Sequence, residues 1–327
     1  METIQISSIK LPASRICLGT WAIGGWMWGG TDEKESIDTI LAALNLGINM
    51  IDTAPVYGFG VSEEIVGKAL QKYGQREKVI LATKVGLEWR DDKIVRNSSP
   101  ERIRKEIEDS LKRLQTDYID LYQIHWPDPK VPFADTAATM LSLLKEGKIR
   151  AIGVSNYSPA QMDEFRKITE IQASQPPYNL FEREIDKEIF PYTEKNHITT
   201  LAYGSLCRGL LTGKMKPDTQ FTGDDLRKND PKFKMPRFQE YLNAVKALQE
   251  FAQKNYGKNV MALAERWILD KGHTVALRGA RNPEQIQSAK EAMGWKLDAN
   301  AMQQIDRILQ DNIKNPVGPE FMAPPER

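Results

Sequence analysis

Four side chains of this sequence could together move a proton, and each follows an apolar stretch. Asp52 and Tyr57 flank a proline turn after one stretch, Lys84 ends a second, and His125 ends a third. A buried carboxylate needs a partner, because desolvation alone favours its neutral form. Carboxylate, phenol, ammonium and imidazole groups are the ones that general acid–base catalysis uses. These four residues are therefore the first candidates for a catalytic site.

Hydride transfer to a carbonyl carbon is a reaction that these groups could serve, because the carbonyl oxygen becomes negative and must take a proton. A free tyrosine, with a pKa of about 10, gives up its proton poorly at neutral pH. A nearby ammonium stabilises the phenolate, so Lys84 would lower the pKa of Tyr57, and Asp52 would keep Lys84 charged. His125 would donate a hydrogen bond that orients the carbonyl. The residues thus predict carbonyl reduction with Tyr57 as the general acid.

A second set of polar residues could hold the nicotinamide cofactor that this reduction needs. Ser155 and Asn156 end one apolar run and Gln175 ends the next. Together they offer the donors and acceptors that a carboxamide requires. Tyr203, at the end of a further run, could stack on a nicotinamide ring.

Two later segments carry glycines and cations suited to phosphate groups. Residues 204–213 form a glycine-punctuated loop whose backbone amides, together with Arg208, suit a pyrophosphate. The predicted contacts in this loop are Ser205, Leu206, Arg208 and Gly209. Residues 278–285 enter a helix after the last apolar run, where barrels often bind phosphate. Arg281 would clamp a ribose 2′-phosphate there, which favours NADP over NAD.

The segments that position these residues alternate between apolar runs and amphipathic helices. The predicted strands are 16–20, 48–51, 79–84, 119–125, 149–154, 170–175, 198–203 and 274–277. Continuous apolar runs are typical of parallel strands covered by helices. Eight such units without a linker predict one (β/α)8 TIM barrel domain, residues 1–327, with an N-terminal hairpin and an extra C-terminal helix. A doubly wound sheet is the alternative, but its Gly-x-Gly-x-x-Gly motif is missing after the first strand.

Capping residues mark where several helices begin. These signals are Thr31 or Asp32, Ser99 before Pro100, the capping box of Ser158 and Gln161, and Asn282 before Pro283. The polar segment 212–235 is longer than an ordinary connection and is predicted to be a lid. In a barrel the polar strand ends would all meet at one mouth.

Composition narrows the class of protein. The chain has 327 residues, 41% of them hydrophobic, and a net charge of +1. A charge this close to zero does not indicate the large basic surface that nucleic-acid binding requires. Cys17 and Cys207 lie in apolar surroundings and are predicted to be buried free thiols. No secretory signal and no run long enough for a membrane span is evident, so a cytoplasmic monomer or weak oligomer is expected. The three histidines contain no His-x-His pair, so no metal site is predicted.

Taken together, the motifs resemble the aldo-keto reductase superfamily over nearly the whole chain. They are residues 19–21, 52–58, Lys84, 123–128, 153–156, Gln175 and 279–281. The resemblance implies that Tyr57 is the proton donor and that Asp52, Lys84 and His125 complete a tetrad. It is closest to bacterial general-stress aldo-keto reductases, whose tryptophan-rich loop and C-terminal tail are similar to residues 21–30 and 316–325.

The resemblance also implies further contacts with NADP(H) and with a small carbonyl substrate. The implied cofactor contacts are Gly19, Thr20, Trp21, Asp52, Ser155, Asn156, Gln175, Tyr203, Gly279, Ala280, Arg281 and Gln285. The implied substrate pocket consists of Trp21, Tyr57, His125 and Trp126. Two pairs depart from the common pattern: Leu277-Arg278 stands where many relatives have Ile-Pro, and Ser288-Ala289 stands where many have Glu-Asn.

Three functions fit these observations. The first is an NADPH-dependent reductase of aldehydes or ketones, with sugars among the candidate substrates. The second is an NADPH-binding, redox-sensing regulatory barrel with slow turnover, because related barrels accompany ion channels. The third is an aldolase that forms a Schiff base at Lys84.

Overall fold

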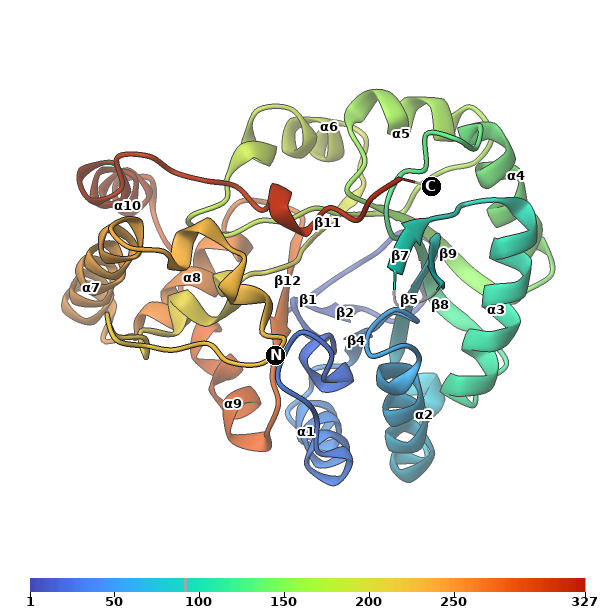
Figure 1. Ribbon diagram of the computed structural model, residues 1–327, viewed down its shortest axis with the longest axis horizontal. Helices are drawn as coiled ribbons and strands as arrows, with labels where there is room; N and C mark the ends of the chain where they lie inside the picture. The colour runs from blue at the N-terminus through green and yellow to red at the C-terminus, as the bar shows by residue number, and fades with distance from the viewer. Residues whose placement is uncertain (91–92, 327) are drawn as a thin grey trace.

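The centre of the computed structural model, which describes residues 1–90 and 93–326, is a closed barrel of eight parallel strands. In order around the barrel these are β3 (Ile16–Gly19), β4 (Met50–Asp52), β5 (Ile80–Val85), β8 (Ile119–Ile124), β9 (Ile149–Ser155), β10 (Ala173–Gln175), β11 (Thr199–Ala202) and β12 (Thr274–Gly279). The last strand pairs with the first, which closes the ring. The predicted (β/α)8 barrel is confirmed (Figure 1).

Helices surround the barrel. They are α1 (Glu33–Asn45), α2 (Val61–Tyr73), α3 (Pro100–Leu114), α4 (Phe133–Lys145), α5 (Pro159–Arg166), α6 (Ile189–Lys195), α7 (Arg237–Tyr256), α8 (Val260–Leu269) and α9 (Pro283–Gln287). Of these, α1, α3, α5 and α9 begin at predicted caps. Asp32, not Thr31, caps α1 by accepting from the Glu35 amide. Ser158 and Gln161 form the predicted capping box. The extra helix, α10 (Ala299–Asn312), packs against α7.

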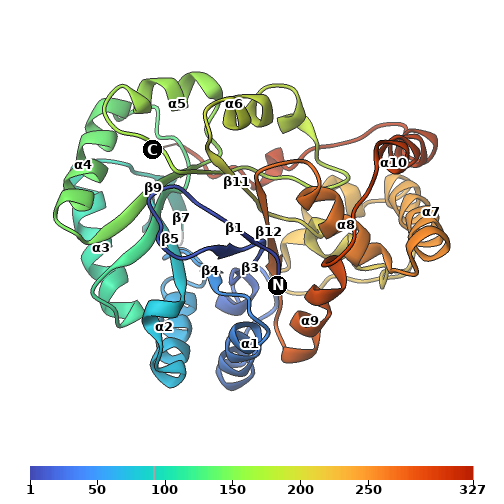
Figure 2. The same cartoon turned by 180° about the vertical axis from the view of Figure 1, so that it is seen from behind.

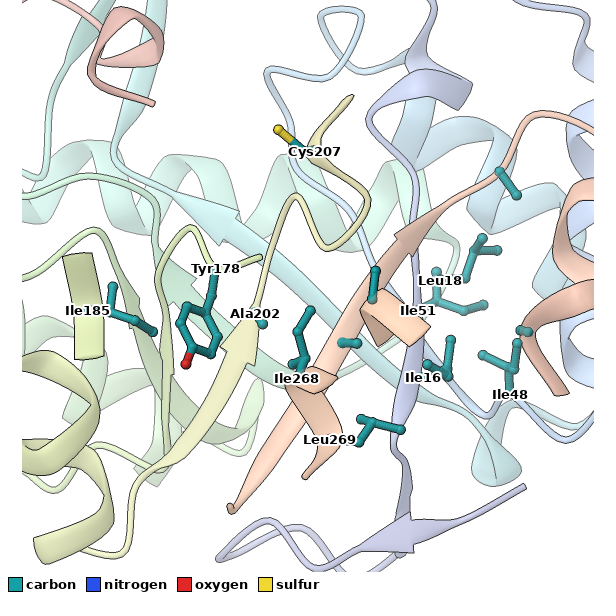
Figure 3. Close-up of a cluster of buried hydrophobic side chains, with 14 of the residues drawn as sticks. Ile16, Leu18, Ile48, Ile51, Tyr178, Ile185, Ala202, Cys207, Ile268 and Leu269 are labelled. Atoms are coloured by element: carbon teal, nitrogen blue, oxygen red, sulfur yellow. The ribbon is translucent and has the colours of Figure 1, made fainter. Parts of the chain in front are cut away.

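Alternation along the strands divides the core into two layers. In β3, Ile16 and Leu18 belong to the layer between barrel and helices, whereas Cys17 belongs to the barrel interior. Figure 3 shows part of the outer layer, including Ile16 and Leu18 of β3 and Ile268 of α8. Because side chains of a strand alternate between faces, residues two apart share a layer. This rule decides which strand-end residues point into the barrel.

A hairpin covers the end of the barrel opposite the mouth (Figure 2). It consists of β1 (Thr3–Ile4) and β2 (Ala13–Ser14), which pair antiparallel. Ile6 and Ile9 between them are buried within the interior layer. The predicted N-terminal hairpin is therefore confirmed, and it closes the barrel floor.

A second hairpin, which the sequence reading missed, extends β5 above the mouth. It pairs β6 (Leu87–Arg90) with β7 (Lys93–Arg96) in antiparallel register. Two short runs with β-branched and aromatic residues on either side of Asp91-Asp92 are a hairpin signal. These two aspartates lie outside the described residues.

Two long segments cross the mouth side of the barrel. Residues 212–235 contain short 3-10 turns at Leu226–Lys228 and Pro231–Phe233. The tail after α10 runs across the face seen in Figure 1 and ends beside β7. Cys17 and Cys207 are buried and free, as predicted. Within the described part of the chain, no helix is both long and apolar enough to cross a membrane.

Candidate active site

Alternation places four polar side chains on the inner face of the barrel, directly above its apolar interior. Met50, Ala82, Leu121 and Ala173 belong to the interior layer. Two residues further along the same strands stand Asp52, Lys84, Gln123 and Gln175, and all four are buried. The apolar stretches of the sequence thus deliver these polar groups to one level of the mouth.

Lys84 connects Asp52 to Tyr57. Its ammonium forms an ion pair with Oδ1 of Asp52 and donates to the Thr53 carbonyl at 3.0 Å. It also lies 3.2 Å from the Tyr57 hydroxyl. Burial alone would lower the pKa of Lys84, but Asp52 and Tyr57 outweigh that effect and raise it. Lys84 is therefore an ammonium at neutral pH, within hydrogen-bond reach of the phenol.

The second oxygen of Asp52 is held by two amides. Gln123 and Gln175 each donate from Nε2 to Oδ2 at 2.9 Å, and Gln175 also reaches Oε1 of Gln123 at 3.0 Å. The side-chain nitrogen of Gln175 is thus engaged inside the barrel. Its side-chain oxygen, Oε1, is the atom left to accept a hydrogen bond from a carboxamide. Gln123 was not among the predicted site residues. Its spacing of two from Leu121, in a strand ending at His125, is the signal that could have found it.

The pKa of Tyr57 differs from the sequence-based expectation. Burial raises the pKa of the phenol, Lys84 opposes the rise, and Asp52 adds to it, with a net increase. Lys84 thus lowers the pKa of Tyr57, as predicted, but no net decrease results, because desolvation of the phenolate is the larger effect. Tyr57 remains fully protonated at neutral pH.

His125 stands next to Tyr57 as a neutral imidazole. The two rings meet edge to face, with centroids 5.8 Å apart. Burial lowers the pKa of His125 well below its usual range, and the charge of Lys84 lowers it further. A neutral imidazole still carries one N–H donor. The site therefore contains a charged donor, a phenol and a neutral donor side by side.

The pKa of His125 predicts a pH dependence of stability. Below pH of about 6.5 the unfolded chain binds a proton at this residue and the folded chain does not, so the free energy of unfolding falls as pH falls. The loss is at most about 1.4 kcal/mol per pH unit. Urea unfolding of the wild type and His125→Gln at pH 7.5 and pH 5.5 measures it. The wild type should lose more stability than the variant; equal losses contradict this assignment.

Close backbone contact fixes the turn that presents Tyr57. The hydroxyl of Thr20 donates to the Asp52 carbonyl at 3.0 Å and accepts from Ser62 at 2.7 Å. Gly58 has φ +68°, and a Cβ on it would lie 2.1 Å from the carbonyl oxygen of Gly24. Only glycine fits between these two backbone segments.

Substitution of Gly58 is expected to displace the turn. Gly58→Ala should cost about 3 kcal/mol or more of unfolding free energy and most of the catalytic activity, because strain and a backbone clash combine. Gly74 is the matched control, since it has the same φ of +68° but nothing within 4 Å of its added Cβ. Gly74→Ala should cost only about 1–2 kcal/mol. Urea unfolding checks both, and equal costs would refute the role of the contact.

The residues predicted to hold a carboxamide do gather beside His125. Asn156 has φ +61° and donates to the His125 carbonyl and to Oγ of Ser155, both at 3.0 Å. Ser155 donates to the backbone carbonyl of Gln175 at 2.7 Å. The Tyr203 hydroxyl donates to Oδ1 of Asn156 at 3.0 Å. The left-handed backbone of Asn156 turns its amide back over the strand end. One hydrogen-bonded group thus links β8, β9, β10 and β11.

Aromatic rings and the tail enclose the space above this group. The ring of Trp21 stacks on that of Tyr57, with the ring centroids 5.7 Å apart and an interplanar angle of 17°. A cavity of about 640 Å³ lies beside the site, and Trp126, Asn156 and Tyr203 form part of its wall. Pro319, Glu320 and Ala323 of the tail also line it.

Arg208, predicted to bind a pyrophosphate, lies in the expected loop but is paired with two carboxylates. Its guanidinium is buried and forms ion pairs with Glu182 and Asp230. An arginine neutralised by two carboxylates is not the free cation that the pyrophosphate prediction requires. A pyrophosphate site in this loop would therefore have to use backbone amides. Ser205 in the same loop is buried and donates to the Leu277 carbonyl at 2.6 Å, Leu206 is half-buried, and Gly209 has φ +90°.

Arg281 and Gln285 do come together at the start of α9. The Arg281 amide donates to Oε1 of Gln285 at 2.8 Å, and the exposed guanidinium donates to the carbonyls of Trp28 and Gly30 at 3.0 Å. The two departures noted in the sequence touch each other, since Arg278 donates to Oγ of Ser288. Gly279 pairs with Gly19 at the adjoining strand ends, and Ala280 follows, buried. These residues therefore form one rim of the mouth.

Comparison with known proteins gives the family. A family model described as "Aldo/keto reductase family" matches residues 15–310. The chain belongs to this family. It is 59% identical to aldo-keto reductase YhdN of Bacillus subtilis, over 100% of this chain and 99% of that one. It is 36% identical to the NADH-specific methylglyoxal reductase of Escherichia coli, over 95% and 100% of the two chains.

Solved structures of the family superpose on this chain over nearly its whole length. The glycerol dehydrogenase AKR11B4 of Gluconobacter oxydans superposes with a TM-score of 0.90 at 54% identity, covering 98% of this chain and 99% of that one. An aldo/keto reductase of Klebsiella pneumoniae in complex with NADP and acetate superposes with a TM-score of 0.73 at 25% identity, covering 94% and 95%. The chain is thus an oxidoreductase of the aldo/keto reductase family, of bacterial type. Among its described residues, no group of three or more His, Cys, Asp or Glu is arranged to hold a metal ion.

Proposed function

We propose that this aldo/keto reductase uses NADPH to reduce aldehydes or ketones, with Tyr57 as the general acid. The observation that supports this most directly is the Tyr57 hydroxyl, 3.2 Å from the Lys84 ammonium and edge to face with His125. A protonated phenol beside a permanent cation can give its proton to an alkoxide and remain stabilised as phenolate. No other phenol in the described mouth has both neighbours.

Each residue of the group has one task in this proposal. NADPH, when bound, supplies the hydride. His125 donates its N–H to the carbonyl oxygen and Tyr57 donates its O–H to the same oxygen, so the developing negative charge meets two donors. The Lys84 ammonium stabilises the phenolate that remains. Asp52 keeps Lys84 charged and aimed, and its own position is fixed by the two glutamine amides described above.

The donor and acceptor set at the strand ends fits a nicotinamide carboxamide. Ser155, Asn156 and Oε1 of Gln175 are the contacts that we propose for it, with the Tyr203 ring beneath the nicotinamide. The backbone of residues 205–209 is proposed for the pyrophosphate. Gly19, Thr20, Trp21, Gly279 and Ala280 would line the same side of the mouth. The substrate would lie against Trp21 and Trp126, next to Tyr57 and His125.

Selectivity for NADPH is proposed on the strength of Arg281, an exposed arginine at the rim of the mouth. A guanidinium recognises a phosphate through two parallel hydrogen bonds. The relatives differ in this respect: the Escherichia coli protein is named NADH-specific, whereas the Klebsiella pneumoniae structure contains NADP.

Cofactor-consumption assays test the proposed function. The purified chain is mixed with NADPH or NADH and with methylglyoxal, glyceraldehyde, aromatic aldehydes, ketones and aldose sugars, and oxidation of glycerol with NADP⁺ is followed in the reverse direction. Loss of absorbance at 340 nm with at least one carbonyl is the expected result. Tight NADPH binding without turnover of any carbonyl would refute the reductase and favour the redox-sensing barrel instead.

Arg281→Ala is expected to weaken NADPH binding selectively. Losing a charge-assisted contact of about 1.5–3 kcal/mol raises the Kd for NADPH roughly 10- to 150-fold. NADH lacks the 2′-phosphate, so its Kd should change less than about threefold. Fluorescence titration of both cofactors measures the difference. Equal changes for both cofactors contradict the proposed contact.

A further inference from the structure

Four buried charges meet in the loops on the mouth side of the barrel, on three separate segments. Glu182 follows β10, Arg208 follows β11, and Asp230 and Lys232 lie in the long segment before α7. Arg208 donates from Nε to Asp230 at 2.7 Å and pairs with Glu182, and Lys232 lies 2.7 Å from Glu182. All four are at most 6% exposed. Two anions and two cations balance, as buried charges require. We call these residues the charge cluster.

The cluster is fastened to the C-terminal tail. The ammonium of Lys232 also lies within the cluster at 3.5 Å from Asp230, and it donates to the Gly318 carbonyl at 2.9 Å. The guanidinium of Arg208 lies 5.5 Å from the centre of the Phe321 ring, a cation–π distance. The barrel therefore holds the start of the tail through two cations that are themselves fixed by carboxylates.

The other end of the tail is held from the hairpin β6–β7. Arg96 donates from its backbone amide to the Pro325 carbonyl at 3.3 Å and from Nε to the Pro324 carbonyl at 3.1 Å. Its Nη1 lies 3.6 Å from Glu326 and donates to the Pro127 carbonyl at 3.2 Å. Residues 317–326, which we call the strap, are thus attached at both ends.

The strap forms one wall of the cavity beside the proposed catalytic residues. Pro319, Glu320 and Ala323, between the two attachments, line that cavity together with Asn156 and Tyr203. Every strap residue is half-buried or exposed. Little apolar burial holds such a segment, so its order depends on the polar attachments at its ends.

We infer that Lys232, through the charge cluster, is a positioning residue that holds the strap closed over the substrate cavity. The lysine does not touch the reacting atoms. It joins the segment before α7 to the strap by donating to the Gly318 carbonyl, so its removal loosens this wall of the cavity. The inference rests on the proposed function in one respect, since it takes the carbonyl substrate to extend past Trp126 into this cavity.

Substitution of Lys232 in the full chain tests this role. Lys232→Met keeps the aliphatic stem and removes the donor to Gly318 and the charge beside Glu182. Lys234→Met is the matched control, because Lys234 is exposed two residues away. Lys232→Arg restores a cation. Arg96→Met removes the side-chain bonds to Pro324 and Glu326 at the other end of the strap and leaves the charge cluster intact, so it provides the second test if Lys232→Met does not fold.

Two measurements are made on each variant. Amide hydrogen exchange of residues 317–323 should speed up about tenfold or more in Lys232→Met and Arg96→Met. The KM for the best carbonyl substrate should rise about tenfold, with kcat and the NADPH Kd within about twofold of wild type. Lys234→Met should match wild type, and Lys232→Arg should recover most of the protection. A residue that only supports the fold would lower the melting temperature without this separation of KM from kcat.

Unchanged exchange in Lys232→Met overturns the inference, and so does an unchanged KM once the strap is released. The exchange measurement needs no turnover. A wild-type chain that reduces no carbonyl therefore refutes the proposed function, while exchange in the strap still decides whether Lys232 holds it.

Discussion

Replacement of Tyr57 by phenylalanine is expected to lower kcat for carbonyl reduction about 10³-fold, while the Kd for NADPH changes less than about twofold. The phenol is the one group near Lys84 that can deliver a proton to the carbonyl oxygen, and phenylalanine keeps the ring stacked on Trp21 at 5.7 Å. Only the hydroxyl is lost. Steady-state NADPH oxidation at saturating substrate gives kcat, and fluorescence titration gives the Kd.

Tyr118→Phe is the control for this substitution. Tyr118 precedes β8 at the floor of the barrel, where its ring lies between Arg76 and Arg150. The same change there should leave kcat within about twofold, because no reacting group is near. A Tyr57→Phe enzyme with a nearly normal kcat would show that the proton comes from elsewhere, and the roles proposed for Lys84 and His125 would fall with it.

The barrel could be predicted because its signals are local. An apolar run of strand length, a capping residue such as Asp32 or Ser158, and the next run recur along the chain, and each is visible within about 15 residues. Parallel strands bring their carboxyl ends together whatever the side chains are. Asp52, Lys84 and His125, each at the end of a run, were therefore placed at one mouth without knowledge of any distance.

Features that depend on contacts distant in sequence were missed or misread. Arg208 stands in a glycine-rich loop and was read as a cation for phosphate, but its partners Glu182 and Asp230 come from other segments. Nothing near Arg208 in the sequence signals that pairing. The net rise in the pKa of Tyr57 was missed for a related reason, because the cost of desolvation depends on everything packed around the phenol. Gln123 lies in an otherwise apolar run, and only the partner of Asp52 across the barrel reveals its role.

Replacement of Lys84 by methionine is expected to cost both activity and stability. Asp52 is 2% exposed, so without the ammonium its carboxylate is buried with only amide donors, and the unfolding free energy should fall by about 3–5 kcal/mol. The phenolate of Tyr57 also loses its cation, so kcat should fall at least about 100-fold. Urea unfolding at pH 7 and steady-state assays measure the two effects. Lys78→Met, a change of an exposed lysine two residues before the same strand, should stay within about 0.5 kcal/mol.

A second substitution separates the burial of charge from the loss of a cation near the phenol. In Lys84→Met with Asp52→Asn, the buried carboxylate is gone, so part of the lost stability should return, whereas kcat should stay low. Recovery of activity in the double variant would contradict the role of Lys84 beside Tyr57. The same ion pair argues against a Schiff-base aldolase, because a nucleophilic lysine must be unprotonated, and the pKa of Lys84 is raised by Asp52 and Tyr57 despite its burial. Treatment with borohydride in the presence of carbonyl substrates should accordingly trap no adduct on Lys84; a trapped adduct would reverse this assignment.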